Sequence, residues 1–230
     1  MTEPRSPIDD AVRAAGAVVG EHAGVTAVTD YGDPEAEIAA SRRLGLADLS
    51  PLARVGFRGP GAREWLAARG VELPDEPNRA RVQPDGSIAI ARSWTEALVL
   101  GALRGADSVC DRLEAGAADG HRVRAYSLPR FDGMFWFALT GASAVDCLAK
   151  LCGVDMRESA FPVGSVAQTS LARLNAVIVR VDLGDMPVFH LLGDSASAEY
   201  AWASLLDAMQ EFDGRPVGLR ALHALAREFE

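Results

Sequence analysis

"FRGPGAREWLAARGVE" (residues 57–72) and "LTGASAVDCLAKLCGVD" (residues 139–155) are two copies of one pattern, and this repeat decides the fold. With Cys152 as the one inserted residue, the two stretches align along their whole length. The matching pairs are Gly59 and Gly141, Ala62 and Ala144, Glu64 and Asp146, Leu66 and Leu148, and Gly70-Val71 and Gly153-Val154. Because a repeat usually marks a repeated structural unit, the sequence predicts two similar halves.

The first copy also has the outline of a phosphate-binding loop, since an apolar strand there turns through glycines into a helix. A dinucleotide-binding loop needs a third glycine for close packing of the helix on the strand, and Glu64 stands at that position. The second copy keeps only Gly141. We therefore interpret both copies as tight strand-to-helix turns. We expect Pro60 at the first helical position, where the missing N–H of proline costs nothing.

Outward from the repeat, each half has the predicted order β-α-β-β-β-α, which makes the fold class α+β. Hydrophobic periodicity predicts strands at 53–57, 87–92, 96–103, 121–128, 131–139, 166–173, 175–182 and 186–193, and helices at 60–69, 107–115 and 195–212. A weakly helical piece at 10–19 precedes them. We divide the chain into an N-terminal segment, residues 1–46, which we expect to contact a partner, and a unit of two halves, about 47–120 and 121–230.

Composition excludes two classes of partner. The chain has 230 residues, a net charge of -9 and a pI near 5.0, so it lacks the clustered positive charge that binds nucleic acid. No stretch approaches the roughly 20 apolar residues that span a bilayer, and the apolar run at 14–20 makes a poor signal peptide. Cys110, Cys147 and Cys152 cannot all pair with one another. We expect a cytoplasmic protein with reduced cysteines in its core.

No set of residues predicts a catalytic or metal site, so we expect none in this chain. The histidines lie in separate elements without helical pairing, and His190, in the strand "VFHLL", is expected to be a satisfied histidine, either buried or on an edge strand, and not a catalyst. Cys147 and Cys152 are expected on different faces of one helix. Asp132 and Asp185 each stand beside glycine and predict turns. Four carboxylates are expected either on solvated helix faces or as partners of the dipole at a helix N-terminus: Glu64, Asp111, Glu199 and Asp207.

The strand predicted at 131–139, within "FDGMFWFAL", is apolar on both faces. Such a strand either lies in the centre of the core or is covered on its outer face by another chain. The sequence leaves both alternatives open.

Two blocks carry a resemblance to known families. "YGDPEAEIAASRRLGLADLSPLARVGFRGPGAREWL" resembles the opening of the folate-binding aminomethyltransferase fold, in which a "DLS" segment precedes a strand, a glycine turn and a helix. "VDMRESAFPVGSVAQTSLARLNAVIVRVD" with "PVFHLLGDSASAEYAWASLLDAMQEF" is similar to the gamma subunits of heterotetrameric sarcosine oxidases. The residues that carry the second resemblance are Asp155, Arg157, Phe161-Pro162, Gly164, Gln168-Thr169, Asn175, Arg180, Tyr200, Trp202, Leu205 and Leu206.

The resemblance implies a structural subunit with the folate-binding fold. Its expected partners are a large, a flavin-bearing and a small subunit, which would hold the FAD, FMN, NAD and tetrahydrofolate of the assembly. Folate-dependent transferases also carry an acidic pair on the early hairpin and a Thr-Gly-Tyr-x-Gly-Glu segment later. This chain has "SIAIARSWTEALVLG" and "ARLNAVIVRVD" in those places, and it lacks the Lys-Gly-Cys motif of the iron–sulfur-assembly relatives.

The sequence thus favours a noncatalytic gamma-type subunit of a sarcosine oxidase or a related N-methyl amine oxidase. One alternative is a free-standing folate-dependent one-carbon transferase. Another is a module that binds folate or a small carboxylate through Arg157 or Arg180, although both arginines could instead pair with the chain's own carboxylates. The amine oxidised and the electron acceptor do not follow from the sequence.

Overall fold

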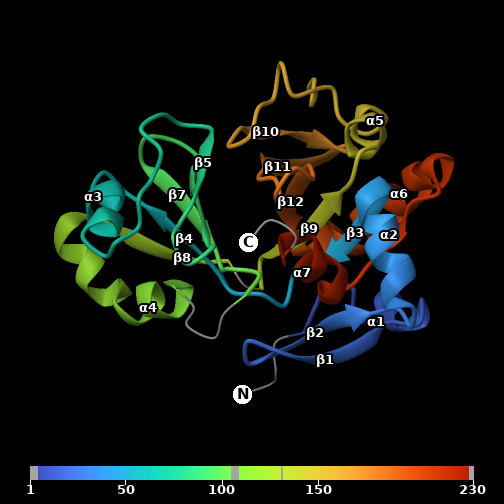
Figure 1. Cartoon of the computed structure of the whole chain (residues 1–230). Helices are drawn as coiled ribbons and strands as arrows, with labels where there is room; N and C mark the ends of the chain where they lie inside the picture. Colours follow the sequence, from blue (N-terminus) through green and yellow to red (C-terminus); the bar gives the residue numbers. More distant parts are fainter. Residues whose placement is uncertain (1–4, 105–108, 131, 228–230) are drawn as a thin grey trace.

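The computed structural model describes residues 5–104, 109–130 and 132–227 (Figure 1). The N-terminal segment contains α1 (Asp9–Ala14), β1 (Val18–His22), β2 (Val25–Asp30) and α2 (Pro34–Leu44). Strand β3 (Gly45–Asp48) leads into a first half of β4 (Arg54–Arg58), α3 (Ala62–Ala67), β5 (Arg79–Val82), β6 (Ile88–Ala91), β7 (Glu96–Leu100) and α4 (Val109–Ala115).

The second half is entered in the same way. After the 3₁₀ helix η1 (Ala117–Val123), strand β8 (Tyr126–Pro129) leads into β9 (Met134–Thr140), α5 (Ala144–Ala149), β10 (Val166–Leu171), β11 (Leu174–Arg180) and β12 (Val188–Asp194). The half ends with η2 (Ser195–Ser197), α6 (Ala198–Met209) and η3 (Gln210–Phe212), and β13 (Arg215–Pro216) and α7 (Leu219–Arg227) follow. Both halves therefore have the predicted order β-α-β-β-β-α, and the α+β fold class is confirmed, although β5 lies where the hydrophobic pattern predicts no individual strand.

The two large sheets repeat the same strand order. The first sheet is β5-β6-β7-β4-β8 and the second is β10-β11-β12-β9-β3-β13, while β1 and β2 form a separate hairpin. Strand β8 lies antiparallel to β4, and β3 lies antiparallel to β9. Each half thus completes its sheet with the strand that precedes the other half, so the repeats exchange a strand.

The glycine turns explain why the repeat is visible in the sequence. Gly59 has a φ of +133° and Gly141 a φ of +107°, a region that side chains disfavour. In both copies the amide three residues later, of Ala62 or Ala144, donates to the glycine carbonyl at 3.0 Å. A Cβ on Gly59 would lie 1.8 Å from the Arg124 carbonyl oxygen, and one on Gly141 would lie 2.5 Å from that of Arg43. Each turn is therefore pressed against the residues that lead into the exchanged strand.

Three apolar clusters hold the layers together. Figure 1 shows α3 and α4 outside the first sheet and α5 and α6 outside the second. One cluster fills the space behind the second sheet, around Phe137 and Trp202, and another fills the space behind the first, around Phe57 and Trp65. The third lies on the inner faces of both sheets and includes Leu222 of α7. Within the described ranges, no helix is long and apolar enough to cross a membrane.

Several predicted boundaries shift. The helix expected at 60–69 begins only at Ala62, so Pro60 lies in the turn and not at the first helical position. The strand expected at 121–128 begins at Tyr126, because η1 extends to Val123 and Arg124 then turns the chain with a φ of +57°. The helix expected at 10–19 ends at Ala14, and β1 follows from Val18. For the helix expected at 107–115, residues 107 and 108 lie outside the described ranges.

The strand that is apolar on both faces is central. All seven residues of β9 are buried, and β9 pairs with β12 on one side and with β3 on the other. Its side chains enter the cluster behind the second sheet and the cluster between the sheets alternately. The alternative that another chain covers this strand is wrong. Phe131 lies outside the described residues.

Candidate functional site

A cavity of about 330 Å³ lies at one end of the space between the two large sheets, and we call it the inter-sheet cavity. Ile88 of β6 and Gly101 after β7 line it from the first sheet, and Trp136 of β9 and His190 of β12 line it from the second. Its volume is within the range of small-molecule sites, which are mostly apolar with a few directed polar groups. This cavity is the candidate ligand site of the fold.

Trp136 and His190 supply the directed polar groups of the inter-sheet cavity. They lie on neighbouring antiparallel strands, two positions apart in register, and so share one face of the sheet. Trp136 Nε1 donates to His190 Nδ1 at 3.0 Å, and both side chains are buried. The expectation of a satisfied histidine is confirmed, and His190 is buried on a central strand rather than on an edge strand.

The hydrogen bond fixes the tautomer of His190. An indole N–H can only donate, so Nδ1 is an unprotonated acceptor and the neutral ring carries its proton on Nε2. Burial lowers the pKa of His190 to about 4, which keeps the ring neutral at physiological pH. His190 lines the cavity, so an acceptor atom of a ligand that reached Nε2 would meet a hydrogen-bond donor.

The carboxylates at the inter-sheet cavity are engaged within the chain. Asp182 accepts from Arg180 Nη2 at 2.9 Å, and Asp85 accepts from the hydroxyl of Ser87 at 2.6 Å. Strand β6 offers only buried isoleucine and alanine side chains. The cavity can therefore hold and orient a small molecule, but the described residues that line it provide no carboxylate poised for proton transfer.

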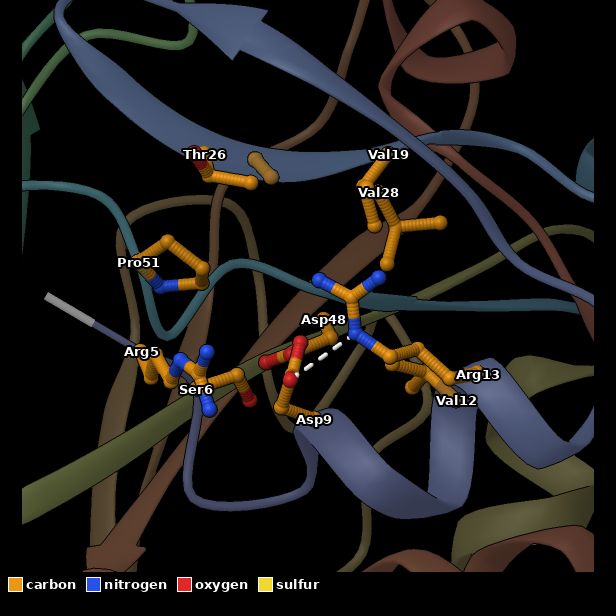
Figure 2. Close-up of a pocket in the computed structure, with 11 residues that line it drawn as sticks. Arg5, Ser6, Asp9, Val12, Arg13, Val19, Thr26, Val28, Asp48 and Pro51 are labelled. Atoms are coloured by element: carbon orange, nitrogen blue, oxygen red, sulfur yellow. Dashed lines mark hydrogen bonds and ion pairs between the residues drawn. The ribbon is translucent and has the colours of Figure 1, made fainter. Parts of the chain in front are cut away.

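A second, smaller pocket lies under the N-terminal segment and is defined by Asp48 (Figure 2). It has a volume of about 70 Å³, enough for a few water-sized groups. Asp48 Oδ1 accepts from the Ser50 amide at 3.0 Å, whereas Oδ2 has no hydrogen bond within the described part of the chain. Burial raises the pKa of Asp48, against smaller opposing effects of nearby serines and Arg54.

The Asp48 pocket is closed by the chain's own N-terminal residues. Figure 2 shows Ser6, Asp9 and Arg13 around the Asp48 carboxylate, and Arg13 Nε reaches back to Asp9 at 2.9 Å. Ile8 and Val12 from the same segment are buried in the core behind the second sheet. This part of the N-terminal segment is thus packed within the chain, and whether the segment also contacts a partner stays a prediction.

The two arginines considered as ligand-binding residues are paired instead. Arg157 Nε donates to Asp155 Oδ1 at 2.9 Å, and this contact lowers the pKa of Asp155 to about 2. Arg180 binds Asp182 and also donates to the carbonyl oxygen of Phe161 at 3.1 Å. The interpretation in which both arginines pair with the chain's own carboxylates is confirmed.

The other residues considered at the sequence level are structural. All three cysteines are buried, and none of them forms a disulfide bond. Burial raises the pKa of Cys147 to about 11. Cys152 lies beyond the end of α5 and forms a backbone β-bridge with Leu171. The expectation that one helix carries both cysteines is therefore wrong. Among the described residues, no group of three or more histidine, cysteine or acidic side chains could hold a metal ion. Glu64, Asp111, Glu199 and Asp207 are exposed, as expected.

The sequence reasoning missed that Trp136 and His190 form a pair. Each was placed in a strand, but strand order was not predicted, so nothing brought the two strands together. The pair could have been suspected from the alternation of side chains between the two faces of a strand. Trp136 and His190 each occupy an inward-facing position next to apolar neighbours.

Comparisons with known proteins agree with this architecture. The family model described as GCVT N-terminal domain matches residues 86–229. A chain of heterotetrameric sarcosine oxidase from Corynebacterium sp. U-96, solved with pyrrole 2-carboxylate, superposes with a TM-score of 0.68 at 22% identity, over 90% of this chain and 95% of that chain. Aminomethyltransferase T of the glycine cleavage system from Bartonella henselae superposes with a TM-score of 0.75 at 17% identity, over 98% of this chain and 63% of that chain. No curated protein matches the sequence.

Proposed function

The chain belongs to the family of GCVT N-terminal domains, and we propose that it is a noncatalytic, gamma-type subunit of a flavin-dependent oxidase of the sarcosine oxidase class. The assembly would remove N-methyl groups from sarcosine or a related amine in the cytoplasm. Its large, flavin-bearing and small subunits would hold FAD, FMN, NAD and tetrahydrofolate. This chain would supply a folded surface to the complex and no reacting group.

The observation that carries the proposal is strand β6. It presents Ile88, Ala89, Ile90 and Ala91, all buried, on the hairpin where the folate-dependent transferases it resembles carry an acidic pair. A one-carbon transfer needs groups that accept and return protons, and the carboxylates at the inter-sheet cavity are already engaged. The superposition with a chain of a heterotetrameric oxidase, over nearly the full length of both chains, supports a subunit role.

Co-expression tests the subunit role directly. The chain is produced with and without the large, flavin-bearing and small subunits of the same organism's oxidase, and size-exclusion chromatography is followed by an amine-dependent turnover assay. We expect co-elution with the other subunits, and no turnover and no stoichiometric flavin or folate for the chain alone. A chain that elutes apart from correctly folded partners would contradict the proposal.

A second candidate function is the binding of a folate-type ligand in the inter-sheet cavity, alone or with one-carbon transfer. The Nε2–H of His190 in a cavity of about 330 Å³ favours it, because a fixed donor in an apolar site can orient a heterocycle. Calorimetric titration of the purified chain with tetrahydrofolate tests this function. Stoichiometric binding would favour the second candidate, and folate-dependent transfer by the chain alone would overturn the first.

A further inference from the structure

Three arginines converge on one carboxylate at the opposite end of the space between the sheets. Arg92 Nη1 lies 2.6 Å from Glu96 Oε1, Arg130 Nη2 lies 3.4 Å from the same oxygen, and Arg58 Nη2 lies 3.1 Å from Oε2. The group has a formal charge of about +2 at neutral pH, because three guanidinium groups face one carboxylate. This local excess is unusual in a chain with a net charge of -9.

The fold is shaped to keep these arginines together. Arg130 lies across Gly56 of β4, where an added Cβ would come within 3.0 Å of Arg130 Nε. Burial lowers the pKa of Arg92, Glu96 opposes that effect, and Arg130 and Arg58 lower the pKa further. Glu96 therefore stabilises the charge on Arg92, against burial and the two neighbouring arginines.

A cleft of about 470 Å³ opens beside this cluster, and we call it the arginine cleft. Arg92 and Arg130 line one wall, while Gln168, Thr169 and Asn175 line the other from β10 and β11. Gln168 joins the walls, since Arg92 Nη2 donates to its Oε1 at 3.0 Å and its Nε2 donates to the carbonyl oxygen of Arg92 at 2.8 Å.

The polar wall of the cleft consists of residues outside the three apolar clusters. Gln168 and Asn175 are exposed, and Thr169 is half-buried. They belong to the stretch that carries the resemblance stated above, and they do not line the inter-sheet cavity. Thr169 Oγ1 also accepts from the thiol of Cys152 at 4.0 Å, and Gln168 Nε2 also donates to Asn78 Oδ1 at 2.8 Å. Among the described residues that line the cleft, the acidic side chain is that of Asp194, which caps η2 by accepting from the Ala196 amide at 2.9 Å.

We propose that the arginine cleft is an anion site that binds a small molecule through a carboxylate group. The carboxylate lies against the guanidinium groups of Arg92 and Arg130, and the amide side chain of Asn175 contacts the rest of the ligand, while Gln168 holds Arg92 in place. Arginine suits this role because its planar N–H groups match the two oxygens of a carboxylate. Glu96 is then the internal competitor that holds the arginines in place between binding events. The site is separate from the inter-sheet cavity and does not depend on the subunit role.

Calorimetric titration with succinate at constant ionic strength tests the proposal, with succinamide as the neutral probe of the same shape. We expect the wild-type chain to bind succinate and not succinamide. Arg130→Gln should weaken binding about tenfold or more, because it removes a lining charge. Glu96→Gln should tighten binding, because it removes the competing carboxylate while all three arginines remain.

Two matched variants locate the effect. Arg157→Gln removes an exposed arginine outside the cleft, and His190→Gln changes the inter-sheet cavity, so both should bind succinate like the wild type. If Glu96→Gln does not fold, the comparison of Arg130→Gln with Arg157→Gln still decides. The proposal is overturned if the wild type does not bind succinate, if succinamide binds equally well, or if Arg130→Gln and Arg157→Gln change the affinity to the same extent.

Discussion

At the scale of single residues, His190 shows how burial sets a protonation state. Its Nδ1 accepts from Trp136 and its pKa is lowered to about 4 by burial alone, so protonation would both place a charge in the core and break the hydrogen bond. The ordinary pKa of histidine, near 6.5, applies to the unfolded chain. Between these two values the unfolded state binds more protons than the folded state, and stability falls as the pH is lowered.

The first prediction follows from this difference. Between pH 6.5 and pH 4, the free energy of unfolding of the wild type should fall relative to that of His190→Gln by about 1.4 kcal/mol per pH unit, or about 3 kcal/mol in all. Glutamine keeps an acceptor for Trp136 but cannot titrate. Urea denaturation of both proteins at half-unit pH steps measures the difference. Groups common to both proteins, including Asp48 with its raised pKa, cancel in the subtraction. Parallel curves would show that His190 does not titrate in this way.

At the scale of elements, the strand-to-helix turns carry the clearest requirement for glycine. Gly141 has a φ of +107°, and a Cβ there would lie 2.5 Å from the backbone of Arg43. Gly153, from the same copy of the repeat, has no positive φ, and a Cβ added to it would have no other atom within 4 Å. The two glycines therefore differ in both strain and space.

The second prediction compares substitutions at these two glycines. Gly141→Val should lower the free energy of unfolding by at least about 2 kcal/mol, from backbone strain and the contact with Arg43. Gly153→Ala should leave it unchanged or raise it by up to about 1 kcal/mol, because alanine reduces the freedom of the unfolded chain. Thermal and urea unfolding of both variants measures this. Equal stability of Gly141→Val and the wild type would mean that the turn tolerates a side chain.

Elements were predictable wherever the pattern was local. The hairpin of β6 and β7, the strands β10 to β12 and helix α6 follow from alternation or helical periodicity, because each buries one face or lies wholly in the core. The boundaries at Pro60, at residues 121–125 and after Ala14 were wrong, because left-handed residues and tertiary contacts ended those elements. The hydrogen bond between Trp136 and His190 could not be predicted, and neither could the ion pairs of three arginines with Glu96, since both depend on strand order.

At the scale of the whole molecule, the exchanged strands bind the halves to each other. Arg54, buried at the start of β4, donates to the carbonyl oxygens of Ser50 at 2.7 Å and Leu52 at 2.8 Å, and also to that of Met134 at the start of β9. The connection from β3 to β4 and the connection from β8 to β9 both cross between the sheets, and Arg54 therefore joins them at one point. The edges of the sheets also meet, where Arg79 of β5 forms a bridge with Ser165 before β10.

The last prediction is that neither half folds alone, although each repeats the same order of elements. A fragment of residues 1–124 keeps β3 but lacks β8, and a fragment of residues 125–230 keeps β8 but lacks β3. In the second fragment one edge of β9 loses its partner, and the apolar cluster between the sheets loses one of its walls. Such a fragment exposes an unpaired, apolar edge that a stable sheet must cover.

Each fragment alone should therefore unfold without a cooperative transition, and an equimolar mixture should recover the circular dichroism spectrum and the cooperative unfolding of the intact chain. The control is the intact chain cut after residue 124 at an inserted protease site, which should stay folded because both exchanged strands are present. A fragment of residues 125–230 that unfolds cooperatively by itself would mean that β3 is dispensable to the second sheet. The repeat would then consist of two units that fold independently, and the exchanged strands would only hold these units together.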